Sequence, residues 1–163
     1  MTAVCRSAVI DAPVDDVWHL LRDFKSHAGW HPVMASSRIE QGAPATATGV
    51  VCNFRLRKGA PLREQLLALS DPGRSLTYCV LDAPLPLENH VATLRLRPVT
   101  DGARIFVEWR STFTAPAGQR VQMVRRVSEA IHEAGCEPCV PCARRALACE
   151  RCPPIVRFTE RNR

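Results

Sequence analysis

Long hydrophobic runs are missing from this sequence of 163 residues. Its longest uncharged stretches, such as residues 43–54, are too short and too polar to cross a bilayer. Residues 1–10 also lack the apolar core of a signal peptide. We therefore expect a cytoplasmic protein without a membrane span.

Clustered basic residues are equally scarce in the first 115 residues, where lysine and arginine barely outnumber aspartate and glutamate. The net charge of +6 comes largely from the C-terminal part of the chain. Nucleic-acid binders usually carry such clusters on one element, together with exposed aromatic side chains. The charge pattern therefore predicts no nucleic-acid partner.

The composition is that of an ordinary globular domain, with 46% hydrophobic and 23% charged residues. These values exclude wholesale disorder and collagen-like or coiled-coil architecture. The length fits one domain with a real core. We expect that domain to span residues 1–135, followed by a tail, residues 136–163, that is rich in Cys, Arg and Pro.

The first elements follow from alternation and from proline. Weak alternation predicts a strand over residues 3–10, and Asp11-Ala12-Pro13 ends it. Pro13 stands where a helix tolerates proline, and the apolar residues that follow are spaced for an amphipathic helix over residues 14–24. A second short helix or turn is expected over residues 24–30, because His31-Pro32 would stop it.

Turn signals then divide the chain into strands spaced as in an antiparallel meander. The expected strands are residues 36–40, 49–57, 62–69, 75–81, 90–98 and 103–113. After them, Val121, Val124, Val127 and Ile131 are spaced for one face of a helix over residues 118–134. The sequence therefore predicts an α+β fold in which a curved antiparallel sheet of about seven strands wraps around a C-terminal helix, with two short helices after the first strand.

Alternation also predicts which side chains face the interior. Ala92, Leu94 and Leu96 share one face, and extending that face backwards adds His90. The same reasoning turns Glu64, Tyr78 and Trp109 inward. A single β-bulge would invert the residues beyond it.

Several segments together resemble the polyketide cyclase/dehydrase branch of the START-like (SRPBCC) superfamily, which has a helix-grip fold. The resemblance covers residues 4–131 in order. It is carried by the opening strand, residues 11–18, Asp23-Phe24, Trp30-His31-Pro32, Leu62-Arg63-Glu64, Tyr78 and Glu108-Trp109. It implies an internal cavity between sheet and helix that holds a hydrophobic small molecule such as a lipid, polyketide or aromatic compound. Only some members are enzymes, so it supports a pocket more strongly than a reaction.

Aromatic walls with few polar groups are typical of such cavities. The candidate ligand-binding residues are Trp18, Trp30, His31, Phe54, Glu64, Tyr78, His90 and Trp109. The alternative for these aromatic side chains is ordinary core packing, which we favour for Trp18 and Trp109.

Glu64 and His90 are also the candidate catalytic residues. An inward carboxyl with a raised pKa and a nearby imidazole would suit a cofactor-independent cyclase or dehydratase, with Tyr78 as a hydrogen-bond donor. In the alternative, Glu64 pairs with an arginine or a buried water and His90 lies at the cavity mouth. No cofactor is expected for the domain.

The tail contains five closely spaced cysteines: Cys136, Cys139, Cys142, Cys149 and Cys152. Two Cys-x2-Cys pairs are typical of zinc sites, so one interpretation is a zinc-stabilised interaction module. The other, which we favour, is a disordered or out-of-frame ending, because a low-complexity tail needs no packed structure.

Overall fold

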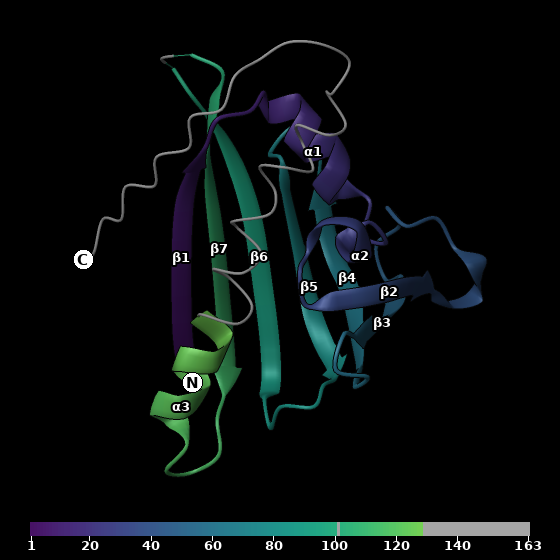
Figure 1. Ribbon diagram of the computed structural model, residues 1–163, viewed down its shortest axis with the longest axis vertical. Helices are drawn as coiled ribbons and strands as arrows, with labels where there is room; N and C mark the ends of the chain where they lie inside the picture. The colour runs from purple at the N-terminus through teal and green to yellow at the C-terminus, as the bar shows by residue number, and fades with distance from the viewer. Residues whose placement is uncertain (101, 129–163) are drawn as a thin grey trace.

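The computed structural model describes residues 1–100 and 102–128. Its sheet has seven antiparallel strands in the order β1-β7-β6-β5-β4-β3-β2 (Figure 1). The elements are β1 (Thr2–Ile10), α1 (Val14–Arg22), α2 (His27–Trp30), β2 (Met34–Ile39), η1 (Glu40–Gly42), β3 (Val51–Leu56), β4 (Pro61–Ser70), β5 (Ser75–Asp82), β6 (Glu88–Val99), β7 (Arg104–Thr114) and α3 (Arg120–Val127). Each strand begins and ends within two residues of its predicted bounds. The predicted α+β helix-grip class is confirmed.

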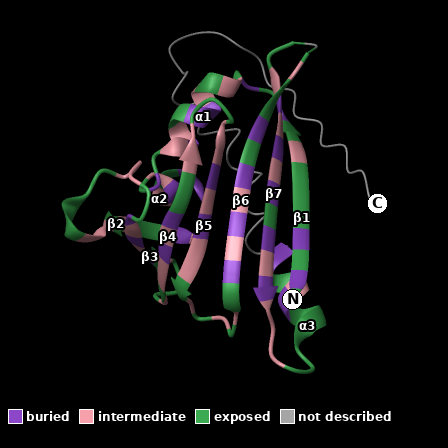
Figure 2. Ribbon diagram, turned by 180° about the vertical axis from the view of Figure 1, so that it is seen from behind, coloured by how far each residue is buried: buried purple, intermediate pink, exposed green. Residues whose placement is uncertain are grey.

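All three described α-helices lie on one face of the sheet, which we call the inner face (Figure 1). Seen from behind, the strands carry no described helix, and buried and exposed positions alternate along them (Figure 2). This alternation follows from the strand repeat, which sends successive side chains to opposite faces. The main core therefore lies between the inner face and the segment that contains α1 and α2.

Helix α1 is held against the sheet by both apolar and polar contacts. Its residues Val17, Trp18 and Leu21 are buried. The Trp18 indole N–H donates to an Asp71 carboxylate oxygen at 2.8 Å, and Arg22 donates to both Asp71 oxygens at 2.8 Å. Asp71 lies in the turn between β4 and β5. This turn therefore fixes the position of α1.

Helix α3 packs at one end of β1 and β7 (Figure 1). Met123 and Val127 of this helix form a small second core with Val4 and Phe113. Val121, predicted to lie on the buried face, is instead 83% exposed. At 100° per residue, the buried stripe through Met123 and Val127 leaves Val121 on the opposite side of the helix. The predicted continuation through Ile131 lies outside the described residues.

The sheet is not fully regular, because one strand pair carries a bulge near the predicted site. In the pairing of β6 with β7, Glu88 lies opposite Thr114 whereas Val91 lies opposite Thr112. Three steps on β6 therefore match two on β7. Asn89, inside this β-bulge, has a φ of 52°, in the left-handed region that few residues other than glycine adopt. The bulge lies immediately before His90.

Within the described residues, no helix has the length and apolar character that crossing a membrane would require.

Candidate functional site on the inner face

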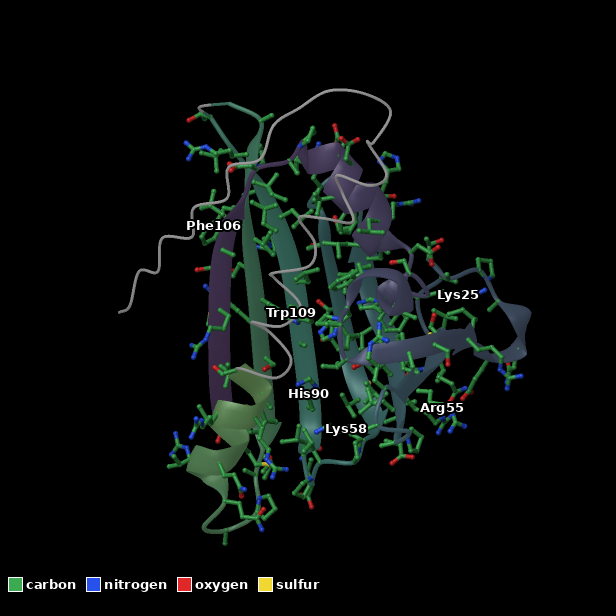
Figure 3. All side chains as sticks on the ribbon, viewed as in Figure 1. Lys25, Arg55, Lys58, His90, Phe106 and Trp109 are labelled. Carbon is green, nitrogen blue, oxygen red and sulfur yellow. The ribbon has the colours of Figure 1, made fainter. Side chains whose placement is uncertain are left out.

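Four adjacent strands bring the predicted polar and aromatic side chains to the inner face. Glu64 lies on β4, Tyr78 on β5, His90 on β6 and Trp109 on β7, and each is at most 6% exposed. Figure 3 labels His90 and Trp109, which lie on the neighbouring strands β6 and β7. Their inward orientation was predicted from alternation alone and is confirmed by their burial.

Tyr78 and Trp109 are joined by a hydrogen bond across the strand that separates them. The Trp109 indole N–H donates to the Tyr78 hydroxyl at 3.2 Å. Cross-strand pairing places Tyr78 opposite Ala92 and Leu94 opposite Trp109. The Tyr78 hydroxyl therefore extends past the small Ala92 side chain toward β7.

The segment that contains α1 and α2 contributes the aromatic rings that face the sheet. Phe24 lies 6.1 Å from Phe54 and 5.9 Å from Tyr78, measured between ring centroids. Trp30 and His31 lie 6.4 Å and 6.0 Å from Trp109. Such edge-on and tilted contacts are favourable for aromatic pairs. The predicted residues Trp30, His31 and Phe54 therefore meet Tyr78 and Trp109 in one aromatic cluster.

Burial changes the proton affinity of Glu64. Desolvation raises the pKa of its carboxyl from the usual 4.5 to about 8. No ion pair or hydrogen bond to the Glu64 carboxyl is found within residues 1–100 and 102–128. The alternative in which Glu64 pairs with an arginine therefore has no support among these residues. Near pH 6, Glu64 is a neutral acid that can donate a proton.

His90 is buried without a hydrogen-bond partner for either ring nitrogen in the described structure. Its ring stacks on Phe113, with centroids 6.2 Å apart and planes at 25°, and lies 6.4 Å from Tyr78. Desolvation lowers the pKa of His90 to about 4. The imidazole is therefore neutral at physiological pH and offers one donor and one acceptor.

Two buried polar residues of the inner face were missed by the sequence analysis. His27, on α2, contacts Phe24, Trp30 and Phe54, and its Nδ1–H donates to the Phe24 carbonyl at 3.0 Å. Burial lowers its pKa to about 4. Ser111, on β7, is 2% exposed. Extending the Trp109 alternation by one step would have found Ser111, whereas His27 lies in a helix too short to show a period.

Trp18 is the predicted site residue that no described ring contact joins to the aromatic cluster. It is buried, and its indole N–H is bound to Asp71. The structure therefore gives Trp18 an anchoring role between α1 and the β4–β5 turn, in agreement with the core-packing alternative.

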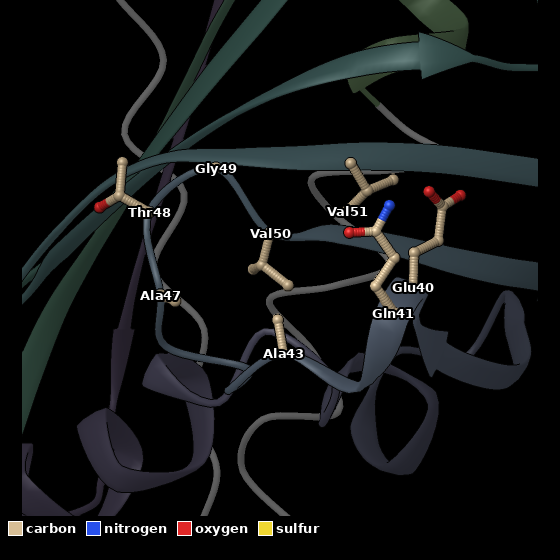
Figure 4. Close-up of a pocket in the computed structure, with 8 residues that line it drawn as sticks. All are labelled: Glu40, Gln41, Ala43, Ala47, Thr48, Gly49, Val50 and Val51. Atoms are coloured by element: carbon tan, nitrogen blue, oxygen red, sulfur yellow. The ribbon is translucent and has the colours of Figure 1, made fainter.

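A separate pocket of about 330 Å³ opens between η1 and the start of β3 (Figure 4). Its lining consists of Glu40, Gln41, Ala43, Ala47, Thr48, Gly49, Val50 and Val51. None of these is a predicted site residue. The Glu40 carboxylate accepts hydrogen bonds from Asn53 at 2.8 Å and Arg63 at 2.9 Å, so its charge is already neutralised within the fold.

Metal ligands do not gather in the part of the chain that the structure describes: no group of three or more His, Cys, Asp or Glu side chains there could hold an ion. Cys5, Cys52 and Cys79 are free thiols. The five cysteines of the predicted zinc site, Cys136 to Cys152, lie outside the described residues.

Known proteins similar to this chain share its fold along nearly its whole length. A protein from Thermobifida fusca is 26% identical, with a TM-score of 0.77 over 89% of this chain and 95% of that one. An uncharacterised protein from Bacillus thuringiensis is 25% identical, with a TM-score of 0.78 over 87% and 98%. The Zhui aromatase/cyclase of a Streptomyces species is 17% identical, with a TM-score of 0.71 over 91% and 96%. No curated protein matches the chain.

A family profile gives the assignment that these individual similarities leave open. The profile described as polyketide cyclase/dehydrase and lipid transport matches residues 1–138, which include every described element and every predicted site residue of the inner face. The seven-stranded sheet with helices on one face agrees with it. The chain therefore belongs to the polyketide cyclase/dehydrase and lipid transport family.

Proposed function

We propose that the protein binds a hydrophobic small molecule, of the lipid, polyketide or aromatic class, between the inner face of the sheet and the helix that begins near residue 118. The observation that carries this proposal is the aromatic cluster around buried polar groups: Phe24, Trp30, Phe54, Tyr78 and Trp109 surround a face that also presents Glu64 and His90. Aromatic side chains with a few polar groups are the usual lining of small-molecule sites.

Native mass spectrometry of the freshly purified protein tests the proposal, with the denatured mass as reference. A non-covalent organic adduct that disappears on denaturation supports it and gives the mass of the ligand. Protein that carries no adduct is then dialysed against naphthalene. Failure of naphthalene to bind would overturn the proposal.

A matched pair of variants locates the bound molecule. Trp30→Leu changes the aromatic cluster, whereas Phe106→Leu changes a side chain that alternation places on the opposite face of β7. Weaker naphthalene binding is expected for Trp30→Leu alone. Equal weakening in both variants would argue against the inner face as the site.

A second candidate, catalysis of cyclisation or dehydration, is favoured by the opposite pKa shifts of Glu64 and His90. Near pH 6 the carboxyl is protonated and the imidazole is neutral. His90 could remove the proton on the carbon next to a carbonyl group, and Glu64 could protonate the departing hydroxyl, with water as the second product. Tyr78 is a further polar group on this face, and no cofactor is needed.

The aldol of acetone and benzaldehyde is a simple probe of this chemistry, because its dehydration gives the strongly absorbing benzalacetone. The wild-type protein is expected to accelerate that dehydration. Glu64→Gln is expected to abolish the acceleration while retaining binding of naphthalene. An unchanged rate in Glu64→Gln would remove this residue from the mechanism.

A further inference from the structure

Few buried polar atoms in the described residues lack a hydrogen-bond partner, and those few are concentrated on the inner face. They are the two ring nitrogens of His90, the hydroxyl of Ser111 and the hydroxyl of Ser128 at the end of α3. Folded proteins nearly always pair such atoms, because an unpaired buried polar group costs free energy. An unpaired group in a native structure therefore requires an explanation, and a bound ligand is one.

The backbone beside His90 is irregular, and this irregularity adds to the free-energy cost of placing the imidazole here. The bulge before it inserts one extra residue, and Asn89 adopts the left-handed conformation. Bulges of this kind re-aim a side chain and are common beside functional sites. A regular strand in which Glu88 and the neighbouring residues kept their pairing would present a different residue at this place.

His90 and Ser111 are close neighbours on the inner face. Ser111 lies directly opposite Ala92 in the pairing of β6 with β7, and Ala92 follows His90 by two residues on the same side of β6. Diagonal neighbours of this type are separated by about 7–8 Å at their backbones. Ala92 and Ser111 have small side chains, so these two residues would offer little steric obstruction to a ligand group beside the imidazole.

The charge of the surroundings limits what that group can be. The buried polar side chains of the described chain include no lysine or arginine. An anionic group would therefore be desolvated here without a counter-charge. Desolvation also keeps the imidazole of His90 and the carboxyl of Glu64 neutral near pH 6. A cation would find no charged partner among these groups either.

We propose that His90 and Ser111 form a hydrogen-bonding subsite for an uncharged hydroxyl or carbonyl group carried by an aromatic ligand. The subsite rests on the proposed function, since it would orient the ligand that is proposed to bind at the inner face. A neutral imidazole and a serine hydroxyl each offer a donor and an acceptor, so together they can bind either type of oxygen. Phe113 and Tyr78, whose rings flank His90, are suited to contact the apolar part of the ligand.

Three probes that share one ring system separate the subsite from general apolar binding. They are naphthalene, 2-naphthol and 2-naphthoate, and equilibrium dialysis near pH 6.5 gives each dissociation constant. We expect 2-naphthol to bind about five- to tenfold more tightly than naphthalene, the effect of about one net hydrogen bond. We expect 2-naphthoate to bind more weakly than 2-naphthol because its charge must be desolvated.

Variants of His90 and Ser111 test whether these two residues cause the tighter binding of 2-naphthol. Ser111→Ala and His90→Phe are each expected to reduce the advantage of 2-naphthol, the ratio of the naphthalene dissociation constant to that of 2-naphthol, to about twofold or less. Ser7→Ala, at an exposed serine of β1, is the control and should retain the full advantage. Thermal unfolding of each variant confirms folding, and Ser111→Ala tests the proposal by itself if His90→Phe does not fold.

The outcomes distinguish this inference from the proposed function. If naphthalene does not bind, the proposed function fails and the subsite fails with it. If naphthalene binds but 2-naphthol has no advantage, or keeps its advantage in Ser111→Ala, the subsite is wrong and the proposed function stands. Tighter binding of 2-naphthoate than of 2-naphthol would also overturn the subsite.

Discussion

The indole N–H of Trp109 donates a hydrogen bond of 3.2 Å to the hydroxyl of Tyr78, and both side chains are buried. The bond links β5 with β7 over the intervening β6. It therefore couples two strands that do not pair with each other, in the centre of the candidate site.

A double-mutant cycle with Tyr78→Phe and Trp109→Phe measures that coupling. We expect an interaction free energy of about 0.5–1.5 kcal/mol, the usual net value of one hydrogen bond. Urea unfolding of the wild type, both single variants and the double variant supplies the four free energies. Strict additivity of the two substitutions would show that the bond does not stabilise the fold.

The raised pKa of Glu64 predicts a pH-dependent stability. Between the usual carboxyl pKa of 4.5 and the folded-state value of about 8, the folded protein holds a proton that the unfolded chain has lost. This contribution to the free energy of unfolding is complete below about pH 4.5 and is lost as the pH rises toward about 8. Denaturant unfolding should therefore show a decline over this interval that is flatter in Glu64→Gln.

His27 and His90 act in the opposite direction. Their pKa values fall from 6.5 to about 4 on folding, so between these values the unfolded chain binds protons that the folded protein does not. Stability from these residues is present above about pH 6.5 and is lost as the pH falls toward about 4. The same experiment on His90→Phe should show a shallower acid limb, and an identical acid limb would contradict the burial of a neutral imidazole.

The packing of α3 is tested by two substitutions on one helix. Met123 is 1% exposed and Val121 is 83% exposed. Met123→Ala should lower the free energy of unfolding by about 2–5 kcal/mol, because it opens a cavity in the second core. Val121→Ala should change it by no more than about 0.5 kcal/mol. The reverse order would mean that Val121 lies on the buried face, as the helical spacing of the valines predicted.

Burial should also determine which cysteines react with an alkylating reagent. Cys52 is completely buried, and burial raises the pKa of its thiol to about 12, whereas Cys5 is exposed. Brief treatment of the native protein with iodoacetamide, followed by peptide mass mapping, should modify Cys5 and spare Cys52. Denatured protein is the control, in which both are modified. Rapid modification of native Cys52 would mean that β3 opens readily.

Alternation along the strands predicted most of the side chains of the inner face, because in a half-buried strand every second residue faces the core and is apolar. The orientation of His90 was obtained by extending the pattern back from Ala92, and it is correct because the bulge lies on the Glu88 side of His90. The hydrophobic alternation of the sequence does not predict the bulge itself. Its position depends on the register between β6 and β7.

The helical residues were harder to predict. His27 lies in a helix of four residues, which is barely one turn and shows no period. The role of Trp18 depends on Asp71, which is 53 residues away and is brought to α1 by the β4–β5 turn. The predicted face of α3 is correct for Val124 and Val127 and wrong for Val121, because the spacing of the valines gave no weight to Met123. In each case a tertiary contact decides what the local pattern leaves open.

The strand order also limits the sequence of events in folding. Strands β2 to β6 each pair with the next strand along the chain, whereas β1 pairs only with β7, some hundred residues later. Closing that long loop is the most costly pairing in entropy and tends to be late. During synthesis β1 therefore leaves the ribosome well before its partner exists. Until residues 104–114 follow, both edges of β1 are open to pairing with other chains, whereas in the finished sheet β7 covers one of them.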